Sequence, residues 1–510
     1  MKGDFSRISF DPSDHFSRVL LQQGRVTLDA DPNEGQAILL HYLRTLARDL
    51  IGPCGGPADR LGFELLLDRS GTEPRLSIAA GRYYVDGVLV ENEVECEYGD
   101  QPDYTPAADD PVFRRLKNQL DADVWLYLDV WERHITWIED DSIRESALGG
   151  PDTCTRARVT WQVRAIARDA LLTSLQAKRD QVATRLAGMP EDDPRFAALS
   201  AHAARLDAAI AALDAEGETG KDCRAPIEAL LPISTALMTA RLQPGAQSKD
   251  PCVISPEASY RGAENQLYRV EVHRASAPGV TPTFKWSRDN GSVAARWLES
   301  EGDDLIVSSA RGFEPGVWVE LSDEANELSG QPGMLVKLTK VQGDRLSVDP
   351  DSVPEGKNIA LFASAVSPKV RRWDQAANDD IQLTAGAVPL LEAAPGDPRW
   401  IDLEDGVQVQ FAADGSYRSG DYWLIPARVA TGSIEWPNVR AADGSTLWEA
   451  RAPHGVGHHY APLGFLGPNS DGDPEVSPCT CEIQPINSCG PNLRVRKRVA
   501  PIKTPKKPPK

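Results

Sequence analysis

The chain of 510 residues is 41% hydrophobic and 25% charged, long enough for three or four domains of about 150 residues each. Its net charge is −20; the last twenty positions hold eight basic residues and no acid, so the rest carries −28. Such an acidic body repels nucleic acid, which excludes DNA or RNA as the main partner. The sequence contains no run of about 18 apolar residues, so we expect no membrane span. Its N-terminus lacks the basic-then-apolar layout of a signal peptide, so we expect synthesis in the cytoplasm.

Residues 1–52 predict an extended arm followed by a capped helix. Asp31 suits the N-cap, Pro32 suits the first helical position, and Glu34 completes a capping box. Gly52 and the proline after it end the helix. An apolar stripe at helical spacing runs along one face, at Leu39, Leu43, Leu46 and Leu50.

The arm before this helix is too short to form a core, so it must lie on its own body or on a neighbouring subunit. Such a segment can add a strand to an exposed sheet edge. The residues that we expect to make this contact are Phe5, Arg7, Phe10, Phe16 and Arg25.

A calcium loop is an alternative for the same region, because Asp29, Asp31 and Asn33 alternate as EF-hand ligands do. Such a loop then needs glycine and glutamate where this chain has Glu34 and Leu40. Helix capping is therefore the preferred interpretation.

Residues 53–167 and 218–300 predict one β domain. Asp86-Gly87 between two apolar runs is a strong hairpin signal. Residues 124–131 form a nearly continuous apolar strand, and residues 158–164 alternate between apolar and polar.

Residues 168–217 interrupt that domain and predict an antiparallel coiled-coil hairpin with two prolines in its loop. The first helix repeats apolar residues from Leu172 to Leu186, and the second from Phe196 to Leu213. The hairpin either projects as a docking arm or packs on the sheet.

Short strands with glycine turns follow every 8 to 12 residues over 301–366 and predict a small barrel, its last strand at 359–362. Residues 367–470 predict a C-terminal β domain, and residues 471–510 a flexible tail with cysteines and basic residues. The predicted fold is thus mainly β and multidomain: antiparallel β modules, a small β-barrel, an N-terminal arm plus helix, and the inserted hairpin.

Phosphate loops, dinucleotide fingerprints, zincin helices and nucleophile elbows are absent from the sequence, so we predict no catalytic residue, no cofactor and no enzyme. A weak zinc candidate lies near the C-terminus, at His454, His458, Cys479, Cys481 and Cys489. The cysteine spacing is unusual for zinc. The sequence leaves three alternatives for the cysteines: free thiols, a disulfide formed after release, or zinc ligands. For the histidines, a structural role is the preferred interpretation.

Twelve tryptophans and 75 acidic residues leave an all-β glycan-binding or glycan-cleaving protein as an alternative function. Most tryptophans stand in apolar alternation, where core packing is the usual reason. A sugar bound in a tryptophan-lined cleft would favour this alternative.

Several longer blocks resemble an uncharacterised family encoded in gene clusters for extracellular contractile injection systems, which are phage-tail-like particles. The blocks are MKGDFSR at 1–7, QQGRVTLDADPNE at 22–34, FKWSRDNGSV at 284–293, GDYWLIPAR at 420–428 and HHYAPL at 458–463. Pro32 departs from the family, where tryptophan is expected.

The resemblance implies a structural component of such a particle, associated with its baseplate, and no reaction. Its expected partners are baseplate or tail subunits and further copies of itself. We expect it to be made in the cytoplasm and assembled into a particle that can be released.

Overall fold

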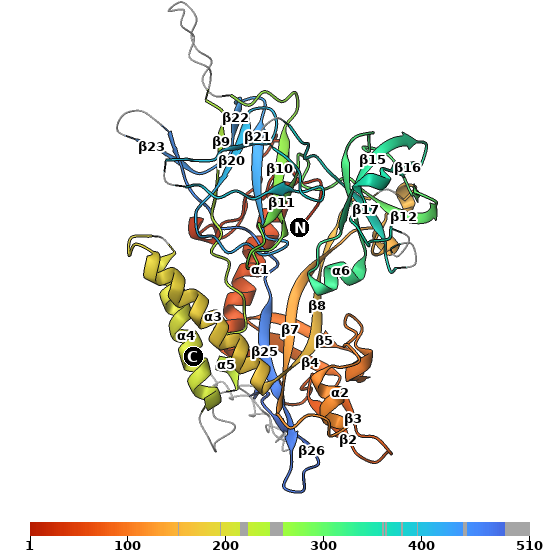
Figure 1. Ribbon diagram of the computed structural model, residues 1–510, viewed down its shortest axis with the longest axis vertical. Helices are drawn as coiled ribbons and strands as arrows, with labels where there is room; N and C mark the ends of the chain where they lie inside the picture. The colour runs from red at the N-terminus through yellow and green to blue at the C-terminus, as the bar shows by residue number, and fades with distance from the viewer. Residues whose placement is uncertain are drawn as a thin grey trace, which may run out of the picture.

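The computed structural model describes residues 1–150, 152–193, 195–214, 223–244, 259–359, 362, 365–378, 381–394, 396–441 and 446–484. Its strands form three units with separate hydrophobic cores (Figure 1). The predicted fold class, mainly β and multidomain with a small barrel, is confirmed.

The first β unit, drawn mostly in orange in Figure 1, also receives strands from the end of the chain. One sheet contains β1 (Cys54–Pro57), β4 (Gly81–Val85), β5 (Val88–Asn92) and β27 (Glu482–Ile483). A second contains β7 (Val124–Ile135), β8 (Arg156–Ala167), β25 (His459–Pro468) and β26 (Pro474–Pro478). A third contains β2 (Leu65–Asp68), β3 (Arg75–Ile78) and β6 (Cys96–Glu97), and α2 (Pro111–Leu116) packs nearby.

The predicted hairpin between β4 and β5 is confirmed. Asp86 and Gly87 adopt φ of 49° and 82°, the left-handed geometry that a two-residue turn of this kind requires.

The second β unit has two sheets around one core. The larger contains β10 (Gln266–Arg274), β11 (Thr283–Ser287), β18 (Val388–Pro389), β21 (Tyr422–Arg428) and β22 (Ser433–Ile434). The smaller contains β9 (Met238–Leu242), β19 (Ile401–Asp402) and β20 (Val407–Phe411), and a hairpin follows, formed by β23 (Asn438–Arg440) and β24 (Thr446–Trp448).

The third unit is a closed barrel of six strands, with α6 (Glu324–Ser329) beside it (Figure 1). The strands are β12 (Ala294–Glu301), β13 (Asp304–Val307), β14 (Trp318–Ser322), β15 (Met334–Gln342), β16 (Arg345–Val348) and β17 (Lys369–Trp373). The strand predicted at 359–362 is not one of them, although residues 360 and 361 lie outside the described part. β17 closes the barrel instead, by pairing with both β12 and β14.

The cores divide the chain differently from the predicted domains. β10 and β11, expected to join residues 53–167, share a core with β20 and β21 of the predicted C-terminal domain. β25 leaves that domain and pairs with β7 of the first unit. Long-range strand pairing, which local patterns do not encode, sets these boundaries.

The predicted tail begins later than expected. Residues 474–478 and 482–483 form β26 and β27, which pair with β25 and β1. Residues 485–510, which hold all the basic residues of the predicted tail, lie outside the described part.

Two helices form the inserted hairpin, α3 (Arg168–Gly188) and α4 (Phe196–Asp214), and α5 (Arg224–Glu228) follows. Leu171 and Leu175 are fully buried in a core that also includes Trp125 of β7 and Ile166 of β8. The hairpin therefore packs on the body at its base, while its coiled-coil character stays a prediction.

By length and composition, one stretch in the described part of the chain, Phe196–Leu213 of α4, is apolar enough to cross a membrane. Its apolar residues contribute to the core shared with α3.

The N-terminal helix α1 (Ala30–Ile51) begins earlier than predicted, and Asp31 is not its cap. Asp29 occupies the N-cap position without a side-chain cap bond, because its carboxylate accepts the Ser6 amide at 2.9 Å. Glu34 accepts the Ser9 hydroxyl instead of closing a capping box. The acids at the helix start thus hold the arm, and Gly52 ends the helix as predicted.

Candidate functional site

The chain start lies at the junction of the three β units (Figure 1). The Met1 amino group donates to the Tyr422 hydroxyl at 3.0 Å, and the Met1 carbonyl accepts from Arg269 at 3.1 Å. The Asn290 side-chain amide donates to the Gly3 carbonyl at 2.9 Å. Polar contacts to the second β unit therefore fix the first three residues.

Three of the five predicted interface residues contact their own chain. Phe5 packs edge-on against His134 of β7, with ring centroids 6.2 Å apart. The Arg7 guanidinium lies 3.7 Å from the Glu435 carboxylate, and the Phe10 ring lies 5.7 Å from a histidine ring of α1. The first ten residues are thus a docked segment of the body.

A cavity of about 820 Å³ surrounds the chain start and holds a cluster of buried charges. The Lys2 and Lys285 ammonium groups lie 3.0 and 3.3 Å from the Glu271 carboxylate. Lys285 also pairs with Glu320 and lies over the Trp373 ring, 4.4 Å from its centroid. Paired in this way, the charges avoid most of the penalty for unpaired burial.

Burial and ion pairing both shift pKa values in this cluster. Burial lowers the pKa of Lys2 to about 8, although Glu271 opposes that effect. Burial would raise the pKa of Glu320, but Lys285 and Lys2 outweigh it and lower that pKa to about 2. At neutral pH Lys2 is therefore mainly protonated and Glu320 is ionised.

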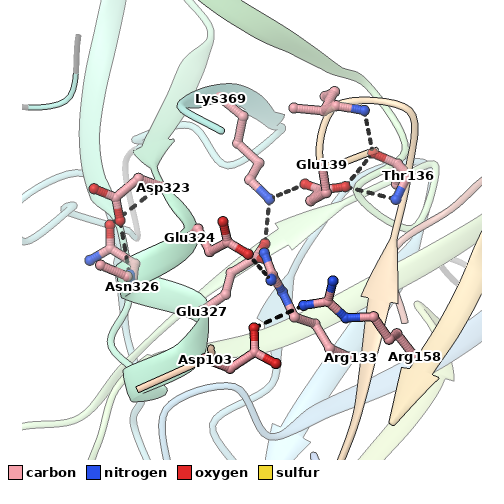
Figure 2. Close-up of polar contacts among 12 residues, drawn as sticks. Asp103, Arg133, Thr136, Glu139, Arg158, Asp323, Glu324, Asn326, Glu327 and Lys369 are labelled. Carbon is pink, nitrogen blue, oxygen red and sulfur yellow. Dashed lines mark hydrogen bonds and ion pairs between the residues drawn. The ribbon is translucent and has the colours of Figure 1, made fainter. Parts of the chain in front are cut away.

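A second charge network joins the first β unit to the barrel (Figure 2). Arg133 of β7 pairs with Glu324 and with Glu327 of α6, the latter at 2.9 Å. Lys369 of β17, 1% exposed at its side chain, pairs with Glu327 and with Glu139. Arg133 of the first unit pairs with two carboxylates of α6, and Lys369 of the barrel pairs with Glu139, which follows β7, so the network links the two units.

Local hydrogen bonds hold the acids of this network in place (Figure 2). The Thr136 amide donates to Glu139 at 2.7 Å, and Asp323 caps α6 in a reciprocal box with Asn326. Burial would raise the pKa of Glu139, but Lys369 outweighs it and lowers that pKa to about 2. Glu139 therefore stays ionised at neutral pH, as a structural ion pair requires.

The other two predicted interface residues lie in an exposed loop, residues 15–28. Phe16 is 60% exposed, and Arg25 is also exposed. Further apolar residues that the site prediction omitted are exposed beside them: Leu20, Leu21, Val26 and Leu28. The loop forms no strand, and both of its ends are held, by the docked start and by α1.

The apolar stripe of α1 is exposed as well. Its four leucines are between 54% and 71% exposed: Leu39, Leu43, Leu46 and Leu50. Only Ala30 and Ile38 of α1 are buried. Exposed apolar surface of this kind, contiguous along one element, is typical of sites that bind a protein, a membrane or a ligand. We call residues 15–28 together with this stripe the arm-helix surface.

The zinc candidates do not converge on a metal centre. Cys479 forms a disulfide with Cys223, Cys481 is an exposed free thiol, and Cys489 lies outside the described residues. The His454 ring packs against Tyr422, and His458 pairs with Asp129 at 2.6 Å. The residues that the structure describes contain no group of three or more ligands placed for a metal.

The pair of His458 and Asp129 lines the cavity beside Trp131. Such a pair can serve acid–base catalysis when a nucleophile lies within hydrogen-bond reach. In the described part of the chain, His458 has no hydroxyl or thiol hydrogen-bonded to its ring. The pair instead links the residue that precedes β25 to β7.

The tryptophans behind the glycan alternative lie mainly in cores. Seven are at most 6% exposed: Trp131, Trp161, Trp286, Trp297, Trp373, Trp423 and Trp436. Side chains this buried serve mainly to pack against neighbouring strands.

Comparison with known proteins gives a family and several distant structural likenesses, two of which follow. The profile of a family of unknown function, DUF6519, matches residues 1–508. A search of the curated proteins found no match. A crystal structure of TssK is 8% identical with a TM-score of 0.16, covering 79% of this chain and 99% of that one. The baseplate complex from the type VI secretion system contains a chain 12% identical with a TM-score of 0.16, covering 70% of this chain and 98% of that one. TM-scores this low establish no common fold.

Proposed function

The chain belongs to the DUF6519 family of unknown function, and we propose that it is a structural, baseplate-associated component of a contractile phage-tail-like injection particle. In this proposal it is not an enzyme. It is made in the cytoplasm and joins other particle proteins, with further copies of itself, through the arm-helix surface.

The observation that carries the proposal is the exposure of that surface. Leu20 and Leu21 are each 69% exposed, and Val26 is 85% exposed, on a loop whose two ends are anchored. Anchoring lowers the conformational entropy that the loop loses on binding, so the surface is prepared for a partner.

The blocks that resemble the injection-system family support the proposal by their positions. Asn290 and Tyr422, from the blocks at 284–293 and 420–428, both hold the chain start. Arg428 ends the second block and donates to the Ser6 carbonyl at 2.9 Å. The resembling blocks thus meet where the first ten residues dock, so they serve to present the arm-helix surface.

The test is incorporation into particles produced by a strain that carries the intact gene cluster. We expect a Leu20→Ser, Leu21→Ser, Val26→Ser variant to fold normally, because the three side chains are exposed. Its amount in purified particles should fall at least about tenfold, the effect of losing about 1.4 kcal/mol of binding free energy.

The matched control is Val439→Ser with Leu447→Ser, two residues 52% and 55% exposed on the hairpin of β23 and β24. This control should enter particles at the wild-type level. Equal incorporation of both variants would refute the arm-helix surface as the attachment site, and a wild-type chain absent from particles would refute the proposed function.

A further inference from the structure

We propose that residues 18–22 of one chain add an antiparallel strand to β5 of a second copy. The inference rests on the proposed function and names one partner of the arm-helix surface: another copy of this chain. It also predicts the register, with Arg18 opposite Glu91 and Leu20 opposite Leu89.

β5 presents an open edge within the part of the chain that the structure describes. It is the last strand of its sheet, paired on one side with β4 through Tyr84 opposite Leu89. Val85 pairs with Val88 across the two-residue turn, so the backbone groups of Val88 and Val90 bond to β4. Those of Leu89 and Glu91 therefore point outward, where a further strand can pair.

The edge is acidic and partly apolar. Leu89 is 39% exposed and Val94, just beyond the strand, is 72% exposed. Three exposed glutamates surround them, at Glu91, Glu93 and Glu95. A partner for this edge needs apolar side chains and basic groups.

Residues 15–28 have this complementary composition. They contain Arg18 and Arg25 and no acid, in a chain whose net charge is −20. Residues 18–22 belong to no helix or strand of their own chain and lead into a turn in which the Arg25 amide donates to the Gln22 carbonyl at 3.3 Å. Neither arginine forms an ion pair within the described residues.

The proposed register also matches the two faces of the added strand. Arg18 and Leu20 would lie beside Glu91 and Leu89 on the exposed face, as an opposite-charge pair and an apolar pair. Val19 and Leu21, on the other face, would extend the apolar side of β5, where Val88 and Val90 are buried.

The loop of a chain lies away from its own β5. The turn that begins β5 packs against Arg44 of α1. Residues 18–22 lie about 14 Å back along the same helix, where Val19 lies against Gly35, and the Leu28 amide donates to Asp31 at 3.0 Å. The edge is therefore open to the loop of another copy.

A charge-reversal cycle on the purified full-length chain tests the pairing. Sedimentation velocity from about 1 to 100 µM should show self-association of the wild type, weakened at least about tenfold in Arg18→Glu and in Glu91→Arg alone. The variant with both reversals should regain most of the lost affinity. Glu355→Lys, an exposed position on the barrel side of the chain, should leave self-association unchanged.

A wild type that stays monomeric throughout, or a combined variant no better than the single ones, would overturn the inference. If particle incorporation still required Leu20, Leu21 and Val26 in that case, the proposed function would stand, with another particle protein as the partner. If the cycle succeeded but incorporation were unaffected, self-association would stand without the proposed function.

Discussion

Lys369 is a buried cation of the network that links the first β unit to the barrel. Its side chain is 1% exposed and contacts Glu139 and Glu327 (Figure 2). Removing one member of a buried ion pair leaves the other charge without compensation. Replacing Lys369 should therefore lower the free energy of unfolding more than replacing an exposed lysine does.

Lys369→Met should lower the free energy of unfolding by roughly 3–5 kcal/mol, the usual consequence of breaking a buried pair. Urea denaturation followed by tryptophan fluorescence measures the change. Lys340→Met, at an exposed position on β15, is the matched control and should stay within about 0.5 kcal/mol of the wild type. A Lys369→Met protein as stable as this control would show that the network contributes little.

The same network predicts sensitivity to acid. The pKa of Glu139 is lowered to about 2 from an ordinary 4.5. The stability from this shift, on the order of 3 kcal/mol, is present in full above pH 4.5 and is lost as the pH falls through about 2. The wild-type melting temperature should therefore fall in this window.

A Glu139→Gln variant lacks the titrating carboxyl, so its melting temperature should fall less steeply between pH 4.5 and 2. Calorimetry of both proteins across that range makes the comparison. Parallel curves for the two proteins would mean that other carboxylates, such as Glu320, account for the acid response.

At the scale of elements, the disulfide from Cys223 to Cys479 joins the start of α5 to the strand region after β26, across 256 residues of sequence. Bridges that close long loops restrict the unfolded chain strongly. Cys223→Ser with Cys479→Ser should cost roughly 2–5 kcal/mol. Thermal unfolding with and without reductant measures this cost.

Reductant should lower the wild-type melting temperature to that of the double variant and leave the double variant unchanged. Cys154→Ser, which removes an exposed free thiol, is the control and should behave as the wild type does. A wild type insensitive to reductant would mean that the bridge adds no stability.

Strands and turns were predictable where their determinants are local. The Asp86-Gly87 hairpin, the strand from residue 124 and most barrel strands follow from alternation and turn residues. The pairing of β25 with β7 could not be predicted, because it joins segments more than 300 residues apart that share no local signal. The helix start was misplaced because Asp29 and Glu34 bind the arm instead of capping the helix.

The candidate site was predictable in composition but not in geometry. The apolar arm and the leucine stripe were visible, yet the sequence left open whether the arm lies on its own chain. Lys285 and Lys369 were missed because a lysine within a strand normally points to water, and their acidic partners come from other elements. The only sequence signal for Lys285 was its place in the block at 284–293.

At the scale of the molecule, the first ten residues and the Lys369 network join three separate cores at one junction (Figure 1). The arm-helix surface begins where this junction ends, so its position is set by all three units. Deleting the whole arm would therefore remove junction contacts together with the attachment surface. Substitutions confined to exposed side chains of residues 16–28 separate the two effects.

The central claim is that the arm-helix surface attaches the chain to a contractile phage-tail-like particle. Cryo-microscopy of particles purified from a strain with the intact gene cluster, with mass spectrometry of the same sample, tests it most directly. We predict this chain within the baseplate region, with Leu20, Leu21 and the leucine stripe of α1 buried against a neighbouring subunit. Particles that lack the chain, or that contain it with this surface facing solvent, would contradict the claim.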